Sequence, residues 1–167
     1  GAIARIDNRR MARALLALNK PVVNLRGTVP GLPFPFLGAD NEAVARMGAG
    51  HLLERGFVHF GFCGFARGYH PGLDRRGECF RRLIEAAGYR CNLYQQPRGP
   101  KGQLKPENEQ RRLARWIRSL PKPVGIMAAN DDRGLAVLNA CRRIGVKVPY
   151  QVAVLGVDND EYLCSLS

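Results

Sequence analysis

The chain has 167 residues and a formal net charge of +12, and hydrophobic residues make up 46% of it. This composition is typical of a soluble globular domain and excludes a disordered acidic tail or a collagen-like repeat. No apolar run reaches the roughly 20 residues that a membrane-spanning helix needs. The N-terminus lacks the pattern of a signal peptide, so we expect a cytoplasmic protein without membrane contact. Its first residues resemble the interior of a strand, so we expect a piece of a longer protein.

The first part of the chain alternates short apolar runs with a helical segment. We expect a strand at residues 3–6, then a helix capped by Asp7, then a strand at residues 22–25. Residues 26–39 contain three prolines, and we predict a loop there that crosses between two subdomains. Residues 1–35 would then form the tail of a first lobe.

Residues 36–167 continue the alternation of strands and helices and are predicted to form a second lobe. Asp40 is expected to cap a helix that turns Met47 inward. Strand followed by helix, repeated along the chain, predicts an α/β fold with a doubly wound parallel sheet, whose ligands bind at the carboxyl ends of the strands. The expected strands cover residues 58–62, 91–94, 124–128 and 152–157, and the expected later helices cover residues 74–87, 107–119 and 132–144.

Motifs for phosphate binding, metal binding and nucleophilic catalysis are missing from the sequence. Neither the P-loop spacing, nor G-x-G-x-x-G, nor the G-x-S-x-G elbow occurs. The five cysteines include no C-x-x-C pair, and the three histidines form no ligand cluster beside them. We therefore expect reduced thiols, no metal and no cofactor. Cys63, at the end of a strand, stays open as a nucleophile.

Five carboxylates follow the last two predicted strands. Helix capping is one interpretation, by Asp131 for the helix 132–144 and by Asp158 or Asn159 for a short final helix. A carboxylate that faces an arginine can also hold sugar hydroxyls, because Asp accepts O–H donors and Arg supplies a rigid fork of donors. Arg67, Arg75 and Arg76 lie in or just after the loop that faces these strand ends, so a polar small-molecule site remains open beside capping. The carboxylates are Asp131, Asp132, Asp158, Asp160 and Glu161.

The basic excess is concentrated between residues 61 and 120. Arg111, Arg115 and Arg118 recur at helical spacing opposite an apolar stripe, which indicates a solvated helix face. Direct contact between this segment and nucleic acid remains an alternative. The sequence contains no helix-turn-helix, zinc finger or interleaved aromatic and basic patch that would read bases.

Three segments, in order, resemble the lac repressor family of regulator sensor domains. The first begins at Asp40-Asn41 and runs through H-L-L-E-R-G to the strand V-H-F-G-F. The second is R-R-G-E-C-F, in which Arg76 is followed by Cys79 where the family usually has glycine. The third is Ala129-Asn130-Asp131 followed by V-P and V-A-V-L-G-V-D-N. A narrower resemblance, at residues 2–6, 116–121 and 156–161, is to the xylose operon regulators, in which an AraC-type DNA-binding domain follows the sensor.

This resemblance implies a periplasmic-binding-protein-like fold of two lobes with a sugar in the cleft, and a DNA-binding domain that lies outside this chain. By position, Arg76, Asp131 and Asp158 would contact the effector sugar, suspected to be D-xylose, and Asn130 would shape the same strand end. The resemblance further implies a cytoplasmic transcription regulator, not an enzyme, that acts as a homodimer on operator DNA. A periplasmic sugar-binding protein of the same fold and an α/β enzyme acting on a sugar or nucleotide remain alternatives.

Overall fold

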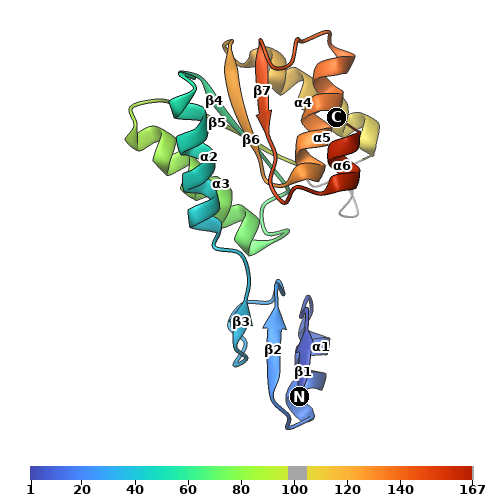
Figure 1. Cartoon of the computed structure of the whole chain (residues 1–167). Coiled ribbons are helices and arrows are strands. Elements are labelled where there is room, and N and C mark those ends of the chain that lie inside the picture. Colours follow the sequence, from blue (N-terminus) through green and yellow to red (C-terminus); the bar gives the residue numbers. More distant parts are fainter. Residues whose placement is uncertain (98–104, 167) are drawn as a thin grey trace.

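Two parallel sheets form the framework of the chain (Figure 1). The computed structural model describes residues 1–97 and 105–166. The strand order is β1-β2-β3 in the first sheet and β5-β4-β6-β7 in the second, and every pairing is parallel. The predicted parallel α/β fold is therefore confirmed. The strands are β1 (Ala2–Ala4), β2 (Val22–Leu25), β3 (Phe36–Leu37), β4 (Phe60–Gly64), β5 (Cys91–Gln95), β6 (Val124–Ala128) and β7 (Val152–Leu155).

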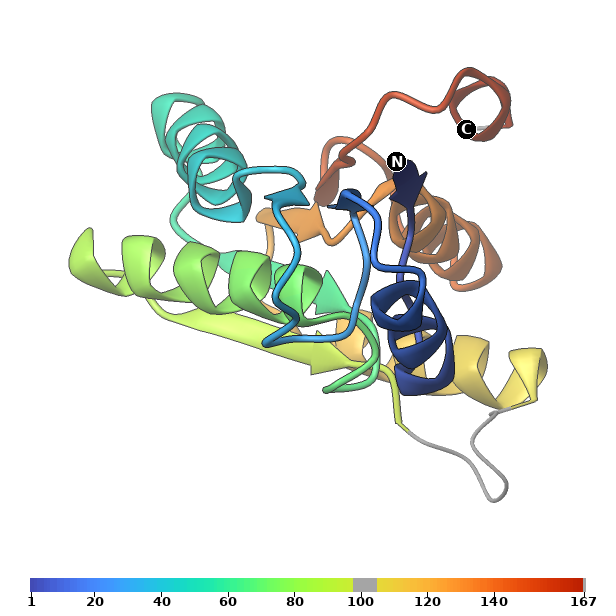
Figure 2. The same ribbon diagram turned by 90° about the horizontal axis from the view of Figure 1, so that it is seen from below.

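Helices cover both faces of the second sheet, as parallel strands require, because each crossover must return along a face of the sheet (Figure 2). Helices α2 and α3 pack together on one face, and α4 and α5 pack together on the other. No described helix is long and apolar enough to cross a membrane. The helices are α1 (Arg9–Ala17), α2 (Asn41–Glu54), α3 (Pro71–Ala86), α4 (Pro106–Ser119), α5 (Asp131–Arg143) and α6 (Glu161–Ser165).

The central strands β4 and β6 are buried at every position, so their apolar runs do not alternate with polar residues. Phe60 of β4 and Phe80 of α3 are fully buried in the core under α2 and α3. Leu113 of α4 and Val137 of α5 are fully buried in the core on the opposite face. These two cores hold the second sheet rigid behind its strand ends.

Two of the predicted helix caps near the chain ends are wrong. Asn8, not Asp7, caps α1, since its Oδ1 accepts a hydrogen bond from the Met11 amide at 2.8 Å. Asp7 instead accepts from the Thr28 amide at 3.2 Å and so ties the loop after β2 to the end of β1. The short helix α6 is capped by Asp160 rather than by Asp158 or Asn159. The predicted cap of α2 by Asp40 is confirmed.

Other element boundaries differ from the sequence-based expectation for identifiable reasons. The predicted loop 26–39 contains β3, which adds to the free edge of β2, so the first sheet extends two residues past residue 35. Helix α3 begins at Pro71 rather than residue 74, because His70 caps it and proline fits the first turn. Met47 does not face inward: it is 75% exposed on α2.

Truncation of a side chain on the buried side of α2 and α3 should destabilise the protein far more than truncation on the exposed side. We expect Phe80→Ala to lower the free energy of unfolding by about 3–5 kcal/mol, because it leaves a cavity in the core. Met47→Ala serves as the matched control and should change it by less than about 0.5 kcal/mol. Urea denaturation followed by circular dichroism measures both. A large loss for Met47→Ala would place that side chain back in the interior.

Candidate functional site

A cleft of about 800 Å³ lies between the two sheets, and the loops at the carboxyl ends of their strands line it. The first sheet contributes residues that follow β1 and β2, and the second contributes residues that follow β4, β6 and β7. Figure 1 shows that the chain passes from β3 to α2 through one connecting segment, and Gly38, Ala39 and Asp40 of this segment line the cleft. The expectation that strand ends carry the site therefore matches where the cleft lies.

Arg76 is a buried charge at the wall of the cleft, and its side chain is 3% exposed. Its Nε donates to Oδ1 of Asn41 at 3.0 Å, and its Nη1 donates to the carbonyl oxygen of Ala129 at the end of β6. Burial lowers the pKa of Arg76, and the carboxylate of Asp158 acts against that shift. Its Nη2 has no hydrogen-bond partner within residues 1–97 and 105–166, so this edge of the fork is left for a ligand.

Asn130 brings the N-terminus of α5 to the same cleft. Its Oδ1 accepts from the Arg133 amide at 3.1 Å, so Asn130 caps α5, and the predicted cap by Asp131 is wrong. Asn130 lines the cleft, and the amide nitrogen of its side chain is a hydrogen-bond donor. Asp132, in the first turn of α5, is exposed and also lines the cleft.

Asp131 is not among the residues that line the cleft. Its Oδ2 accepts from the Asp160 amide at 2.7 Å, and its own amide donates to the carbonyl oxygen of Val157 at 2.9 Å. A Cβ at Gly156 would lie 2.2 Å from Oδ1 of Asp131, so only glycine leaves room for this carboxylate. Asp131 therefore ties α5 to the loop between β7 and α6, which carries Asp158.

Asp158 is exposed at the cleft and holds a backbone conformation that side chains rarely adopt. Its φ is 105°, and Asn159 follows with a φ of 55°. Such residues cost of order 1–3 kcal/mol each and persist where the surrounding structure enforces them. The hydrogen bonds made by Asp131 hold this loop. The negative charge of the Asp158 carboxylate favours the charged form of Arg76 and so acts to raise its pKa. Of the four predicted site residues, the structure thus brings together Arg76, Asn130 and Asp158, and it places Asp131 behind them.

The first sheet supplies a wall that the sequence reasoning missed. Asn24 is buried at the end of β2, where its Oδ1 accepts from the Ile6 amide at 3.2 Å. Arg26, two residues later, has a φ of 56° and lines the cleft. The signal was available, because residues after β2 follow a strand end just as Asn130 follows β6. The three prolines of residues 26–39 are instead typical of a crossover loop.

An aromatic pair lines the cleft. The rings of Phe65 and Tyr69 stack with centroids 4.8 Å apart, and both residues line the cleft. Behind Phe65, the buried guanidinium of Arg133 lies 5.3 Å from the ring centroid and pairs with Glu109 at 2.5 Å. Cys63 also lies behind this layer, and burial raises the pKa of its thiol. Cys63 is therefore not placed as an activated nucleophile.

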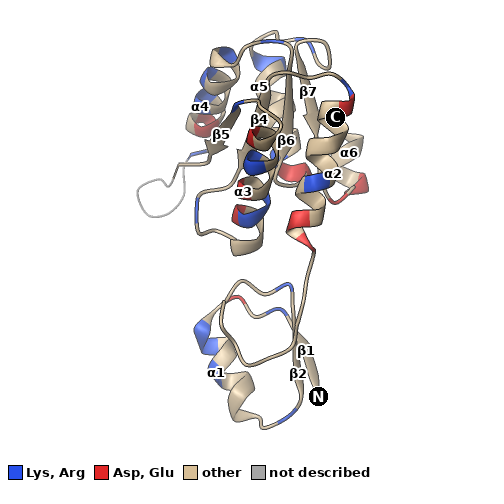
Figure 3. Ribbon diagram, turned by 90° about the vertical axis from the view of Figure 1, so that its left-hand side faces the viewer, with Lys and Arg blue, Asp and Glu red and all other residues tan. Residues whose placement is uncertain are grey.

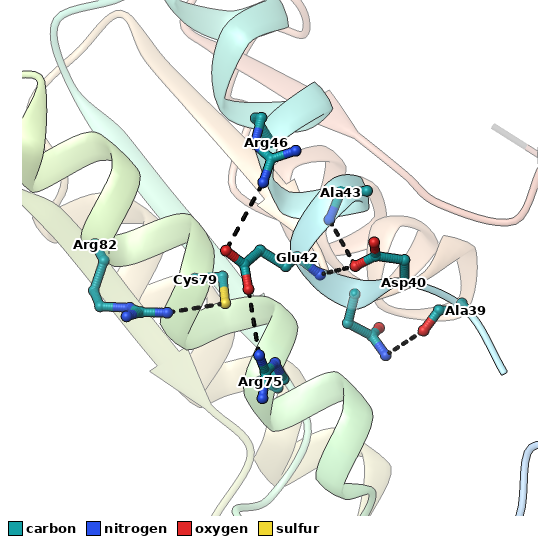
Figure 4. Close-up of polar contacts among 9 residues, drawn as sticks. Ala39, Asp40, Glu42, Ala43, Arg46, Arg75, Cys79 and Arg82 are labelled. Carbon is teal, nitrogen blue, oxygen red and sulfur yellow. Dashed lines mark hydrogen bonds and ion pairs between the residues drawn. The ribbon is translucent and has the colours of Figure 1, made fainter. Parts of the chain in front are cut away.

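The N-terminus of α2 is fixed by an ordered set of polar contacts (Figure 4). The Ala43 and Glu42 amides donate to Asp40 at 3.0 Å each, and the Ala43 bond is the main cause that lowers the pKa of Asp40. Glu42 reaches across to α3 and pairs with Arg75 at 3.3 Å. Cys79, in place of the usual glycine, is buried in the core, and Arg76 keeps its bonds to both neighbouring elements.

His70 caps α3 at the edge of the cleft, where its Nδ1 accepts from the Gly72 amide at 3.1 Å. Burial lowers the pKa of His70, and the charge of Arg5 adds to that effect. Within residues 1–97 and 105–166, no three His, Cys, Asp or Glu side chains are grouped as a metal site would need. The cleft therefore offers hydrogen-bond donors, carboxylates and aromatic rings.

The sequence profile of the periplasmic binding protein-like domain family matches residues 49–167. The xylose operon regulatory protein of Escherichia coli strain K12 is 31% identical over 176 aligned residues, which cover 100% of this chain and 43% of that protein. The chain thus spans less than half the length of the curated relatives it matches. These relatives are transcription regulators rather than enzymes.

Solved structures show the same fold. A xylose-binding transcription activator superimposes with a TM-score of 0.83 at 30% identity, over 95% of this chain and 43% of that chain. A LacI family transcriptional regulator from Silicibacter pomeroyi superimposes with a TM-score of 0.69 at 26% identity, over 96% of this chain and 60% of that chain. The expected resemblance to lac repressor-like sensors, and to xylose regulators among them, is confirmed.

The two carboxylates of the loop between β7 and α6 should respond differently to substitution. We expect Asp131→Ala to lower the free energy of unfolding by about 0.5–1.5 kcal/mol, because the exposed amide of Asp160 loses its acceptor. Asp158→Gly should raise it by about 1 kcal/mol, because glycine relieves the positive φ. Thermal unfolding of both variants gives the comparison. Equal and small effects would mean that Asp131 does not hold the loop.

The cap formed by His70 predicts a pH-dependent stability. The folded pKa of His70 lies below its ordinary value of 6.5, so the unfolded chain binds the proton more readily. This contribution to stability is complete above pH 6.5 and is lost as the pH falls toward the lowered pKa. We expect His70→Asn, which keeps a good cap, to flatten the fall in melting temperature between pH 7 and pH 5. His51→Asn, on exposed α2 surface, is the control, and equal flattening by both would contradict the assignment.

Proposed function

Because the chain belongs to the periplasmic binding protein-like domain family, we propose that it is the effector-binding sensor of a bacterial transcription regulator, with a sugar as effector. The observation that carries this proposal is the free edge of Arg76 beside Asp158 and Asn130 in a cleft between two sheets. Arginine and carboxylate together match the vicinal hydroxyls of a sugar, because one donates in pairs and the other accepts in pairs. The stacked rings of Phe65 and Tyr69 add an apolar surface for the face of a sugar ring.

D-xylose is the effector we propose, on the strength of the relatives named xylose operon regulatory proteins and the xylose-binding activator. Those relatives are regulators, which supports a protein that binds its sugar without converting it. In this proposal the protein acts in the cytoplasm as a homodimer, and a DNA-binding domain outside residues 1–167 contacts the operator. Residues 1–37, which include β3, belong to the first lobe and the rest of the chain to the second.

The mechanism follows from the position of the site between the lobes. A sugar that contacts the first sheet and the strand ends of the second binds the closed arrangement more tightly than the open one. It therefore shifts the population toward closure by its difference in affinity for the two arrangements. The attached DNA-binding domains would then change their spacing on the operator.

A thermal-shift screen of the full-length protein tests this function. D-xylose at 100 times its dissociation constant should add about 2.7 kcal/mol of stability. Arg76→Lys should abolish most of that shift, because a lysine cannot present the fork that reaches Asn41, Ala129 and ligand together. Arg82→Lys, an exposed arginine on the same helix, is the matched control and should keep the shift.

Three outcomes would count against the proposal. A shift with another pentose or a hexose but not with xylose would retain the sensor and remove the xylose assignment. Wild-type sugar affinity in both Arg76→Lys and Asp158→Asn, measured by calorimetry, would show that the site lies elsewhere. Turnover of the sugar during the titration would replace the sensor with an enzyme.

A further inference from the structure

The outer surface of α4 and α5 carries a dense group of exposed cations, which we call the basic face. The two helices pack side by side, and Figure 3 shows their Lys and Arg residues in the lobe that lies away from β1 and β2. All members of the basic face are exposed. They are Arg111, Arg112, Arg115 and Arg118 of α4, Arg142 and Arg143 of α5, and Lys147 just after it.

In the part of the chain that the structure describes, no ion pair joins the basic face to a carboxylate, and Glu107 is the acidic residue nearest to it along α4, one turn before Arg111. Residues 110–130 and 133–157 contain neither Asp nor Glu. The acidic residues of the two helices lie in or near their first turns, at the opposite end from the last-turn arginines. Within the described chain, the only ion pair on these helices joins Arg133 to Glu109 in the interior. The helix dipoles favour this separation of charge, but they do not require seven cations.

The helices on the other face of the same sheet show a different arrangement. There Arg81 pairs with Glu78 at 2.5 Å and with Glu85 at 2.6 Å, and Glu42 pairs with Arg46 and Arg75. Arginines on α2 and α3 are thus balanced by carboxylates on the same two helices. The solvated surface of α2 and α3 is built from such pairs, whereas the cations of the basic face form no ion pair among the described residues and are more numerous than the three exposed arginines of α1.

Helices α4 and α5 also lack the anchors of a protein-binding surface. None of the large hydrophobic side chains that are exposed in the described residues lies on α4 or α5. Protein partners usually bind around buried aromatic or aliphatic anchors, whereas the backbone of DNA is bound by arginine and lysine alone. From Arg111 to Arg118 the helix rises about 10 Å, which corresponds to about three phosphates along one DNA strand.

We propose that the basic face binds the phosphate backbone of duplex DNA without reading its sequence. The proposal rests on the proposed function, since a regulator is held near DNA by its own DNA-binding domain. The face then adds a second, electrostatic contact from the sensor lobe. Each arginine fork offers paired donors to phosphate oxygens, and each contact made releases counterions from the duplex.

The test compares two triple variants of the full-length protein that remove the same charge. R111Q/R115Q/R118Q removes one stripe of the basic face, and R9Q/R10Q/R13Q removes three exposed arginines from α1. Glutamine suits helices about as well as arginine, so both variants should stay folded. Binding to a 30-base-pair duplex of random sequence is followed by fluorescence anisotropy as the KCl concentration is raised.

The α4 variant should lower the slope of log affinity against log salt by about 2–3, because about 0.9 is lost for each phosphate contact. Its affinity at low salt should fall at least about tenfold, and the α1 variant should keep the slope of the wild type. Equal slopes in all three proteins would overturn the proposal. Equal losses in both variants would do so as well, since they would show an effect of net charge alone.

Two further readouts separate this inference from its rivals. Polyglutamate of matched charge should compete weakly with DNA, and tight competition that depends on the α4 arginines would identify an acidic protein partner instead. The xylose-induced thermal shift should be the same in both variants. Absence of that shift in every protein would contradict the proposed function while leaving the slope comparison interpretable.

Discussion

Burial of one guanidinium group constrains the wall of the cleft. Arg76 carries its charge into the protein, where an unpaired cation would be costly, so its donors must find oxygens. Asn41 provides one at the start of α2, and the Ala129 carbonyl provides another at the end of β6. Three elements that are distant in sequence therefore meet at one side chain. Because Ala129 directly precedes Asn130, the same bond also sets where the capped start of α5 faces the cleft.

Much of this arrangement was predictable from the sequence, because periodicity and strand ends carry it. The buried run Val124–Ala128 was predicted with its observed bounds, and its carboxyl end led to Asn130. The helix caps were harder. Asp7 and Asp131 each stand one residue from the true cap, and each side chain serves a tertiary bond instead. When two neighbouring positions both hold Asp or Asn, the local sequence does not show which side chain caps the helix and which makes a tertiary hydrogen bond.

The wall supplied by the first sheet was only partly predictable, for a different reason. Arg26 reaches the cleft because β3 adds to β2 and turns the intervening segment back over the strand ends. A two-residue strand gives no periodic signal, and the prolines around it suggest a loop. Arg26 and Asp158, on opposite sides of the cleft, both hold positive φ angles. Conformational strain is thus concentrated where the two lobes approach each other, as is common at ligand sites.

The close approach of Gly156 to Asp131 has an evolutionary consequence. With 2.2 Å between a hypothetical Cβ and the Asp131 carboxylate, the two positions cannot vary independently. A side chain at position 156 requires a smaller or differently directed residue at position 131, and the Asp160 amide then needs another acceptor. Related chains should therefore show these positions changing together, as a correlated pair separated by 25 residues, and chains that keep both should share the backbone path that presents Asp158.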